Sequence, residues 1–251
     1  MKKIACIVLP MYNEVENIKV LIPLLFEQSA RISSHELHVL VVDDKSPDGT
    51  ATLVKNLHKN FDNLHLLVGD KKGLGDAYTR GIKFALENIA PDIVIQMDAD
   101  LQHDPKLIPL FIELTEFGFS MVIGSRFASG GEIINFALHR RFLSVFGNIL
   151  IRFFGGLPRI RDCTSGYRCI KANLLRQCRM SGLSTRGYAY QSSLLCELLR
   201  NGARVVEIPI TFSRRKHGSS KLSLRDQIDF LVYEPDRHCF SQNQKNNIRK
   251  F

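Results

Sequence analysis

Short apolar runs alternate with segments of helical periodicity along the first half of the chain. Runs rich in β-branched residues predict strands at Ile4–Leu9, Leu37–Val42, Leu64–Val68, Ile93–Met97 and Met121–Ile123. The segments between them predict helices at about Asn17–Gln28, Gly49–Lys59, Leu74–Asn88 and Pro105–Phe117. Strands and helices that alternate in this way predict an α/β fold, with a mostly parallel sheet and helices on both of its faces.

Polar residues directly follow three of these strands. The first strand runs into Pro10–Glu14, the second into Asp43 and Asp44, and the fourth into Asp98-Ala99-Asp100. The carboxyl ends of parallel strands meet at one edge of a sheet, and ligands bind outside that edge. We therefore expect the three clusters to form one binding site.

Asp98 and Asp100 are separated by one residue at the exit of a buried strand, where two carboxylates can share a divalent cation. Hard oxygen ligands suit Mg²⁺ or Mn²⁺, and substrate phosphates commonly complete the coordination of Mg²⁺. The alternative is that aspartates here only cap the following helix. That alternative is favoured for Asp104, which precedes Pro105, whereas the metal is favoured for Asp98 and Asp100.

Gly73 and Gly75 lie between a strand and a helix, as the first two glycines of a dinucleotide-binding fingerprint do. Tyr78 occupies the position of the expected third glycine, so the sequence favours a tight turn over a dehydrogenase site. A second turn is predicted at Ser46–Gly49, which leaves the role of the two preceding aspartates open.

The net charge of +9 is unevenly distributed over the 251 residues. Residues 1–125 hold 12 Lys and Arg against 17 Asp and Glu, whereas residues 126–251 hold 22 against 8. The basic half predicts an anionic partner. It contains no aromatic-basic RNA motif and no zinc-finger spacing, so nucleic acid is disfavoured, and a phosphorylated lipid or an anionic membrane surface is favoured.

The six cysteines form no C-x-x-C pair, so the sequence predicts neither a zinc site nor a disulfide framework and fits a reducing, cytosolic compartment. No uncharged apolar run approaches the roughly 20 residues of a membrane-spanning helix.

Seven segments resemble, in order and spacing, the dolichyl-phosphate mannosyltransferase group of the inverting family two glycosyltransferases. They are LPMYNEVENI, VVDDKSPDGT, GLGDAYTRG, MDADLQHDPKLIP, GSRF, DCTSGYR and HGSSKL, between Ile4 and about Leu222. The resemblance implies the glycosyltransferase A fold and transfer of a hexose, typically mannose from GDP-mannose, to dolichyl or polyprenyl phosphate with inversion. It also implies work at the cytoplasmic face of a membrane, which is the plasma membrane in a bacterium and the endoplasmic reticulum in a eukaryote.

The resemblance further implies roles for individual residues. The residues implied to bind the nucleotide sugar are Pro10, Tyr12, Glu14, Val42, Asp44, Asp98, Ala99, Asp100, Arg215 and Lys221. The implied metal-site residues are Asp98, Asp100 and Gln102. The acceptor phosphate is implied to contact Arg126, Arg140 and Ser144. The implied catalytic set is Asp98, Arg126, Arg140, Arg215 and Lys221.

Two positions depart from the family pattern. Lys45 stands where many relatives have Asp or Gly, which leaves the donor base open, and Arg141 lies next to Arg140 and could exchange roles with it.

The chemistry of a phosphate acceptor agrees with these roles. A phosphomonoester with a second pKa near about 6 is largely dianionic at pH 7, so it can attack the sugar without a general base. A glycosyltransferase with a soluble acceptor is the main alternative and would be expected to carry a carboxylate base, for which Asp162 is the candidate. For the donor, UDP-glucose is the second choice after GDP-mannose.

The segment HRRFLSVFGNILIRFFGG has the pattern of an amphipathic helix. Its wide apolar surface consists of Phe142, Phe146, Ile149, Leu150 and Phe153, and its narrow polar stripe of Arg141, Ser144, Asn148 and Arg152. The pattern fits an interfacial helix and also a helix packed on the sheet. A polyprenyl phosphate must be met at a bilayer surface beside Arg140, which favours peripheral attachment through this helix.

One catalytic domain is expected over residues 1–231, followed by a polar, loosely ordered tail over residues 232–251. Many relatives continue into hydrophobic helices here. A naturally short chain, a separate membrane-anchoring subunit and an altered terminus all remain open as explanations.

Removal of a predicted metal ligand is expected to abolish most of the activity. Asp98→Asn or Asp100→Asn takes one carboxylate from the predicted cation site, which should cost roughly 3 kcal/mol or more of transition-state stabilisation. A chelator should reproduce the loss in the wild-type protein in an assay of sugar transfer, and added Mg²⁺ or Mn²⁺ should reverse it. Full activity of Asp98→Asn in the presence of chelator would contradict the assignment.

Overall fold

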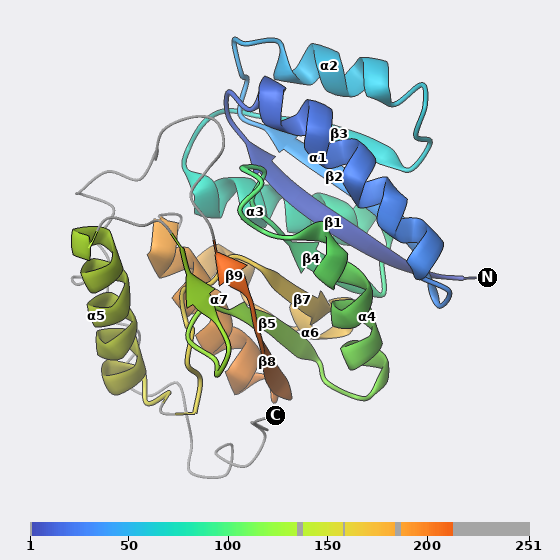
Figure 1. Ribbon diagram of the computed structural model, residues 1–251. Helices are drawn as coiled ribbons and strands as arrows, with labels where there is room; N and C mark the ends of the chain where they lie inside the picture. The colour runs from blue at the N-terminus through green and yellow to red at the C-terminus, as the bar shows by residue number, and fades with distance from the viewer. Residues whose placement is uncertain (1, 135–137, 158, 184–186, 213–251) are drawn as a thin grey trace.

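The computed structural model describes residues 2–134, 138–157, 159–183 and 187–212, and its centre is a seven-stranded sheet of order β3-β2-β1-β4-β7-β5-β8 (Figure 1). Its strands are β1 (Lys3–Met11), β2 (His35–Asp43), β3 (Leu64–Val68), β4 (Ile93–Gln96), β5 (Met121–Ser125), β7 (Arg168–Lys171) and β8 (Val205–Pro209). Neighbouring strands pair in parallel except β7, which is antiparallel to both β4 and β5. The predicted mostly parallel sheet is confirmed.

The helices of the described residues are α1 (Val15–Glu27), α2 (Thr50–Leu57), α3 (Leu74–Phe84), α4 (Ile108–Glu116), α5 (Leu138–Phe154), α6 (Ala172–Leu175) and α7 (Gly187–Arg200). Shorter helical turns lie at η1 (Gln28–Arg31), η2 (Ala85–Ile89), η3 (Pro105–Leu107) and η4 (Met180–Gly182). Two short strands, β6 (Glu132–Ile133) and β9 (Thr211–Phe212), form a separate parallel pair.

Helices cover both faces of the large sheet, as predicted. Alternate residues of a strand point to opposite faces, so Ile7 of β1 belongs to the core that includes residues of α1, α2 and α4, whereas Val8 belongs to the core that includes residues of α3 and α7. Helix α3 approaches the sheet most closely at Gly81, where an added Cβ would lie 2.6 Å from side-chain atoms of both Val8 and Val42. Glycine is therefore required there by space.

The predicted cap at Asp104 is confirmed. Its carboxylate accepts a hydrogen bond from the backbone N–H of Lys106 at 3.0 Å, and Pro105 occupies the first position of η3. Strand β7 was not predicted, because it is only four residues long and begins at the buried, charged Arg168.

The expectation of reduced cysteines is only partly met. Cys6, Cys163, Cys169 and Cys178 are free thiols, whereas Cys196 is disulfide-bonded, which corrects the prediction at this position. Spacing along the chain does not reveal which cysteines meet in the fold. Among the described residues, no helix is long and apolar enough to cross a membrane. The expected tail over residues 232–251 lies outside the described residues, as does the end of the expected catalytic domain.

Candidate active site

The ends of β2, β1 and β4 lie side by side at one edge of the sheet. Met11 at the end of β1 is in register with Asp43 at the end of β2, and Val8 of β1 is in register with Gln96 at the end of β4. The backbone N–H of Asp44 donates to the carbonyl of Met11 at 3.1 Å. Three polar clusters that are distant in the sequence therefore share this edge.

Asp43 holds the loop after β2. Its carboxylate accepts hydrogen bonds from the backbone N–H of Ser46 at 3.1 Å and from the Ser46 hydroxyl at 2.5 Å. The Ser46 hydroxyl oxygen in turn accepts from the backbone N–H of Asn13 in the loop after β1. Asp43 thus acts in the turn and joins two loops, a role that the turn pattern alone left open.

Asp44 is buried beside Arg80 of α3, which forms an ion pair with it and a second one with Asp76 at 2.8 Å. Burial raises the pKa of Asp44, and Arg80 opposes that shift. Lys45 adopts a left-handed backbone conformation with φ of 52° and pairs with Asp70. This wall of the site is therefore a network of alternating charges.

The other residues predicted to hold the nucleotide lie on the same loops. The Lys71 ammonium sits 3.5 Å from the centroid of the Tyr12 ring, and the Glu14 carboxylate accepts from the Asn17 side chain at 2.6 Å. Pro10 is half-buried near the end of β1, and Val42 is fully buried under α3.

The loop after β4 is held by hydrogen bonds at several points. The half-buried Asp98 accepts from the Tyr78 hydroxyl at 3.0 Å, and the backbone N–H of Asp98 donates to Nδ1 of His103 at 3.1 Å. Asp100 accepts from the backbone N–H of Gln102 at 3.1 Å. Leu101 takes a left-handed conformation with φ of 62°, which turns the chain back within this loop. Ala99 between the two aspartates is buried.

The predicted metal ligands form a donor set made only of oxygen. Asp98 and Asp100 supply carboxylates, and Gln102 can supply its amide oxygen. This set fits Mg²⁺ or Mn²⁺, which prefer oxygen ligands and leave room for substrate phosphates. Among the described residues, no group of three or more His, Cys, Asp and Glu could hold a metal.

Tyr78 supports Asp98 from α3. Its ring is fully buried and stacks on Tyr190 of α7, with centroids 5.7 Å apart and planes at 2°. Burial raises the pKa of Tyr78 well above its usual value, and the Asp98 charge adds to the shift. Tyr78 is therefore a neutral hydrogen-bond donor. In the sequence, Tyr78 stands out only as the residue that replaces the third glycine of a dinucleotide-binding fingerprint.

Arg126 follows β5 and is almost fully buried against Asp162. Its Nε and Nη2 groups donate to the two carboxylate oxygens, each at 2.8 Å, and Nη2 also donates to the Thr164 hydroxyl at 2.7 Å. Burial acts to raise the pKa of Asp162, but the Arg126 charge and its hydrogen bonds hold that pKa below the usual value. Asp162 is fully buried and both its oxygens accept hydrogen bonds, which argues against a role as general base.

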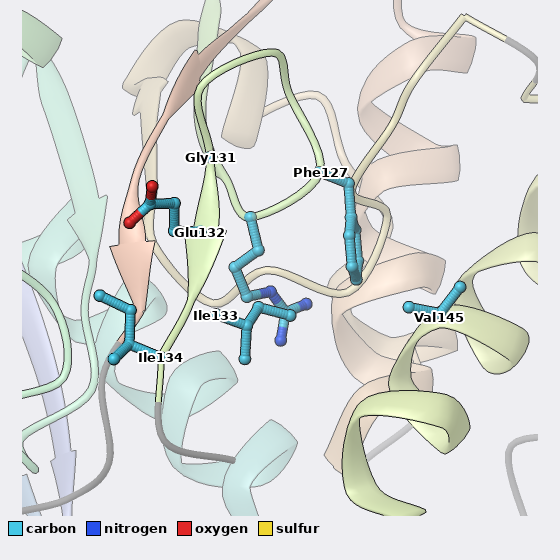
Figure 2. A pocket seen from close by; sticks show the side chains of 7 residues that line it. Phe127, Gly131, Glu132, Ile133, Ile134 and Val145 are labelled. Carbon is cyan, nitrogen blue, oxygen red and sulfur yellow. The ribbon is translucent and has the colours of Figure 1, made fainter. Parts of the chain in front are cut away.

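A cavity of about 280 Å³ lies next to Arg126 between β6 and α5, and Figure 2 shows the residues around it. Its other lining residues are Phe127, Gly131, Glu132, Ile133, Ile134 and Val145. A Cβ on Gly131 would lie within 3 Å of the backbone of Ser125 and Arg126, so only glycine lets the chain return this closely. The lining of the cavity thus combines two charged residues, Arg126 and Glu132, with the apolar side chains of Phe127, Ile133, Ile134 and Val145.

Helix α5 presents apolar side chains to solvent. Phe146, Ile149 and Phe153 are 47%, 50% and 79% exposed, whereas Asn148 is 4% exposed. Asn148 accepts from the backbone N–H of Cys163 at 2.9 Å and donates to the carbonyl of Arg161. The polar stripe therefore meets the protein at Asn148, and the apolar surface faces outward.

Four predicted site residues cannot be placed in this geometry. Arg140 and Ser144 belong to α5, but their side chains are outside the described part of the structure. Arg215 and Lys221 lie beyond residue 212, where the description ends.

Two kinds of comparison relate the chain to known proteins. The family profile described as "Glycosyl transferase family 2" matches residues 6–179. An undecaprenyl-phosphate mannosyltransferase of Micrococcus luteus is 36% identical over 217 residues, which cover 86% of this chain and 86% of that protein. A polyprenol monophosphomannose synthase of Mycolicibacterium smegmatis is 35% identical over 219 residues, which cover 86% of this chain and 80% of that protein.

Solved structures share the fold at low sequence identity. Mannosyl-3-phosphoglycerate synthase from Rubrobacter xylanophilus matches with a TM-score of 0.64 and 18% identity, over 91% of this chain and 70% of that protein. A mannosyltransferase from Pyrobaculum calidifontis in complex with GDP-Man and Mn²⁺ matches with a TM-score of 0.57 and 20% identity, over 87% of this chain and 59% of that protein.

Tyr78→Phe is expected to weaken catalysis without unfolding the protein. The ring still stacks on Tyr190, but Asp98 loses one hydrogen bond to a charged group, worth about 1.5–3 kcal/mol. We expect kcat/KM for the nucleotide sugar to fall roughly tenfold or more while the thermal transition is nearly retained, measured by steady-state kinetics and a melting curve. Wild-type kinetics in Tyr78→Phe would show that this hydrogen bond does not support the site.

Proposed function

Because the chain belongs to glycosyl transferase family 2, we propose that it transfers mannose from GDP-mannose to a polyprenyl phosphate such as dolichyl or undecaprenyl phosphate. The observation that carries this proposal is Arg126 at a cavity that is also lined by apolar side chains, among them Ile133, Ile134 and, on helix α5, Val145. A lipid phosphate needs a cation for its head and apolar surface for its first isoprene units. Two relatives at 35–36% identity over 86% of the chain carry names that specify polyprenol and mannose.

In this proposal the donor would lie at the ends of β1, β2 and β4. Tyr12 and Asp44 would hold the nucleoside, and Asp98, Asp100 and Gln102 would hold Mg²⁺ or Mn²⁺ beside the diphosphate. When bound, the metal supplies positive charge that stabilises the departing nucleoside diphosphate. A solved mannosyltransferase of the same fold contains GDP-Man and Mn²⁺, which supports this choice of donor and metal class.

The acceptor needs no general base. Its phosphate is largely dianionic at pH 7, so an oxygen of that group can attack the anomeric carbon directly. Attack opposite the leaving group inverts the anomeric centre. The buried position of Asp162 agrees with such a reaction, since the carboxylate that could have served as base is bonded to Arg126. A lipid phosphate is therefore favoured over a soluble hydroxyl acceptor.

Helix α5 would place the protein peripherally on the membrane, at its cytoplasmic face. Val145 lines the cavity, and Phe146, Ile149 and Phe153 continue the apolar surface along the helix to solvent. Arg140 and Arg141 in its first turn would meet anionic headgroups. The lipid chain would then leave the cavity directly into the bilayer. Arg215 and Lys221 are proposed to close over the donor diphosphate.

The transfer assay tests the proposed function. GDP-mannose with a labelled sugar, polyprenyl phosphate and Mg²⁺ or Mn²⁺ should give a labelled product that partitions into organic solvent, with UDP-glucose as the comparison donor. Arg126→Lys and Arg140→Lys keep the charge but lose the planar guanidinium, which at Arg126 is also bonded to Asp162, so KM for polyprenyl phosphate should rise while KM for the donor changes little.

Arg176→Lys serves as the control and should behave as wild type, because Arg176 is exposed and is not among the residues proposed to contact either phosphate. If Arg126→Lys and Arg140→Lys weakened donor binding and left the acceptor unaffected, these arginines would be assigned to the wrong phosphate.

Replacing Phe146 and Phe153 by Ser should abolish binding to anionic liposomes and leave the melting temperature nearly unchanged. Neither ring belongs to the buried core, since Phe146 is 47% and Phe153 79% exposed, so their loss should remove membrane contact and little core packing. Phe117→Ser is a matched control, because Phe117 is an equally apolar side chain that is 72% exposed and lies at the end of α4, outside helix α5. Sedimentation and a melting curve supply both measurements.

If the replacement of Phe146 and Phe153 by Ser lowered the free energy of unfolding by several kcal/mol, α5 would instead be a helix that packs in the core. Wild-type protein that stays in the supernatant at low salt would contradict direct attachment and favour a separate anchoring subunit.

A further inference from the structure

We infer that Asp162 is a positioning residue for the acceptor phosphate, which it serves by fixing the Arg126 guanidinium at the edge of the cavity. The inference rests on the proposed function, because it takes Arg126 as the group that meets the phosphate. It adds a residue to the acceptor site that does not itself touch the acceptor, since Asp162 is fully buried.

The contacts between the two residues leave the guanidinium little freedom. Asp162 Oδ2 accepts from Nε of Arg126 at 2.8 Å and also from its backbone N–H at 3.0 Å, and Oδ1 accepts from Nη2 at 2.8 Å. The Thr164 hydroxyl accepts a further bond from Nη2. Rotation of the guanidinium about any of its side-chain torsions would break at least two of these bonds. An arginine held in this way keeps one orientation before the acceptor arrives.

Asp162 is itself held on the opposite side. The two oxygens of Glu207, on β8, accept from the backbone N–H groups of Arg161 and Asp162, each at 2.8 Å. The carboxylate of Asp162 also accepts from the backbone N–H of Thr164 at 3.2 Å. The segment that carries Asp162 is therefore anchored to strand β8. Through Asp162, the same strand fixes the position of the Arg126 guanidinium.

The same segment is joined to helix α5. Asn148 bonds to Arg161 and Cys163, on either side of Asp162. The helix that would receive the lipid chain and the arginine that would receive its phosphate are thus fixed to one short stretch of backbone. Such a common anchor keeps the distance between the apolar and the charged parts of the acceptor site constant, as the fixed geometry of a lipid phosphate requires.

The test is steady-state kinetics of Asp162→Asn in the full chain, with polyprenyl phosphate in detergent micelles and GDP-mannose as donor. Misplacement of the guanidinium should lower kcat/KM for polyprenyl phosphate by up to about 100-fold, mostly through KM, while KM for GDP-mannose stays within about twofold. The pH profile of kcat should keep its shape, whereas loss of a general base would remove its acidic limb. Arg126→Lys combined with Asp162→Asn should be little worse than Arg126→Lys alone, because both changes remove the same contact.

Two further variants separate positioning from stability. Thr164→Val removes one acceptor from Arg126 and keeps the ion pair, so it should fold and raise KM for polyprenyl phosphate by a smaller factor. Val54→Ala removes buried apolar atoms from α2, in the core that includes residues of α1 and α4. It should lower the stability of the protein and leave KM for polyprenyl phosphate unchanged.

The outcomes are distinguishable. Wild-type protein that does not transfer mannose to polyprenyl phosphate overturns the proposed function and this inference with it. Active wild-type protein with an unchanged acceptor KM in Asp162→Asn and Thr164→Val overturns this inference alone. Additive losses in the double variant would likewise show that Asp162 does not act through Arg126.

Discussion

Parallel pairing of β1 with both β2 and β4 is the constraint on which the site depends. It brings the ends of three strands to one edge, so that the segments that carry Tyr12, Asp44 and Asp98 share this edge although they are distant in the sequence. Side chains then fix the loops that follow: Asp43 joins the first two, and Tyr78 holds the third. The sheet determines where the loops of the site lie, and these hydrogen bonds determine how the loops are oriented.

The antiparallel strand β7 links the donor side to the acceptor side. Arg168 at its start is in register with Gln96 at the end of β4 and with Ile123 of β5. Because β7 runs against its neighbours, the segment that precedes it enters the sheet at the edge where β4 and β5 end. Asp162 therefore reaches Arg126, and Gly166 lies next to Asp98, where a Cβ would be 3.4 Å from both carboxylate oxygens. A parallel strand would have placed this segment at the opposite end of the sheet.

Much of the fold could be predicted from the sequence, because five of the strands and the helices between them have clear periodic patterns. The cap at Asp104 was also readable, since an aspartate before a proline has a local physical meaning. Strand β7 was missed because its buried Arg168 breaks the apolar pattern; two of its guanidinium nitrogens donate to the carbonyls of Gln191 and Cys163, whereas its Nε has no hydrogen-bond partner among the described residues. Hydrogen bonds from a buried arginine to backbone carbonyls have no local sequence pattern.

The candidate site was predictable in its residue types and less so in its contacts. The spacing of Asp98 and Asp100 predicted a metal site, but nothing in the sequence indicated that Tyr78 would support it. Arg126 and Asp162 were both singled out, yet as a phosphate ligand and an alternative base; only the fold shows that they form one ion pair. For α5, periodicity left two packing arrangements open, and the buried Asn148 decides that the apolar surface faces outward.

The anomeric configuration of the product tests the central claim most directly, because direct attack by an acceptor phosphate without a base or a covalent intermediate must invert the sugar. The product formed from GDP-α-mannose and polyprenyl phosphate can be isolated and its one-bond carbon–hydrogen coupling at the anomeric carbon measured by NMR. A β-linked mannosyl phosphate is the predicted result. An α-linked product, which requires retention, would contradict the proposed arrangement of donor and acceptor.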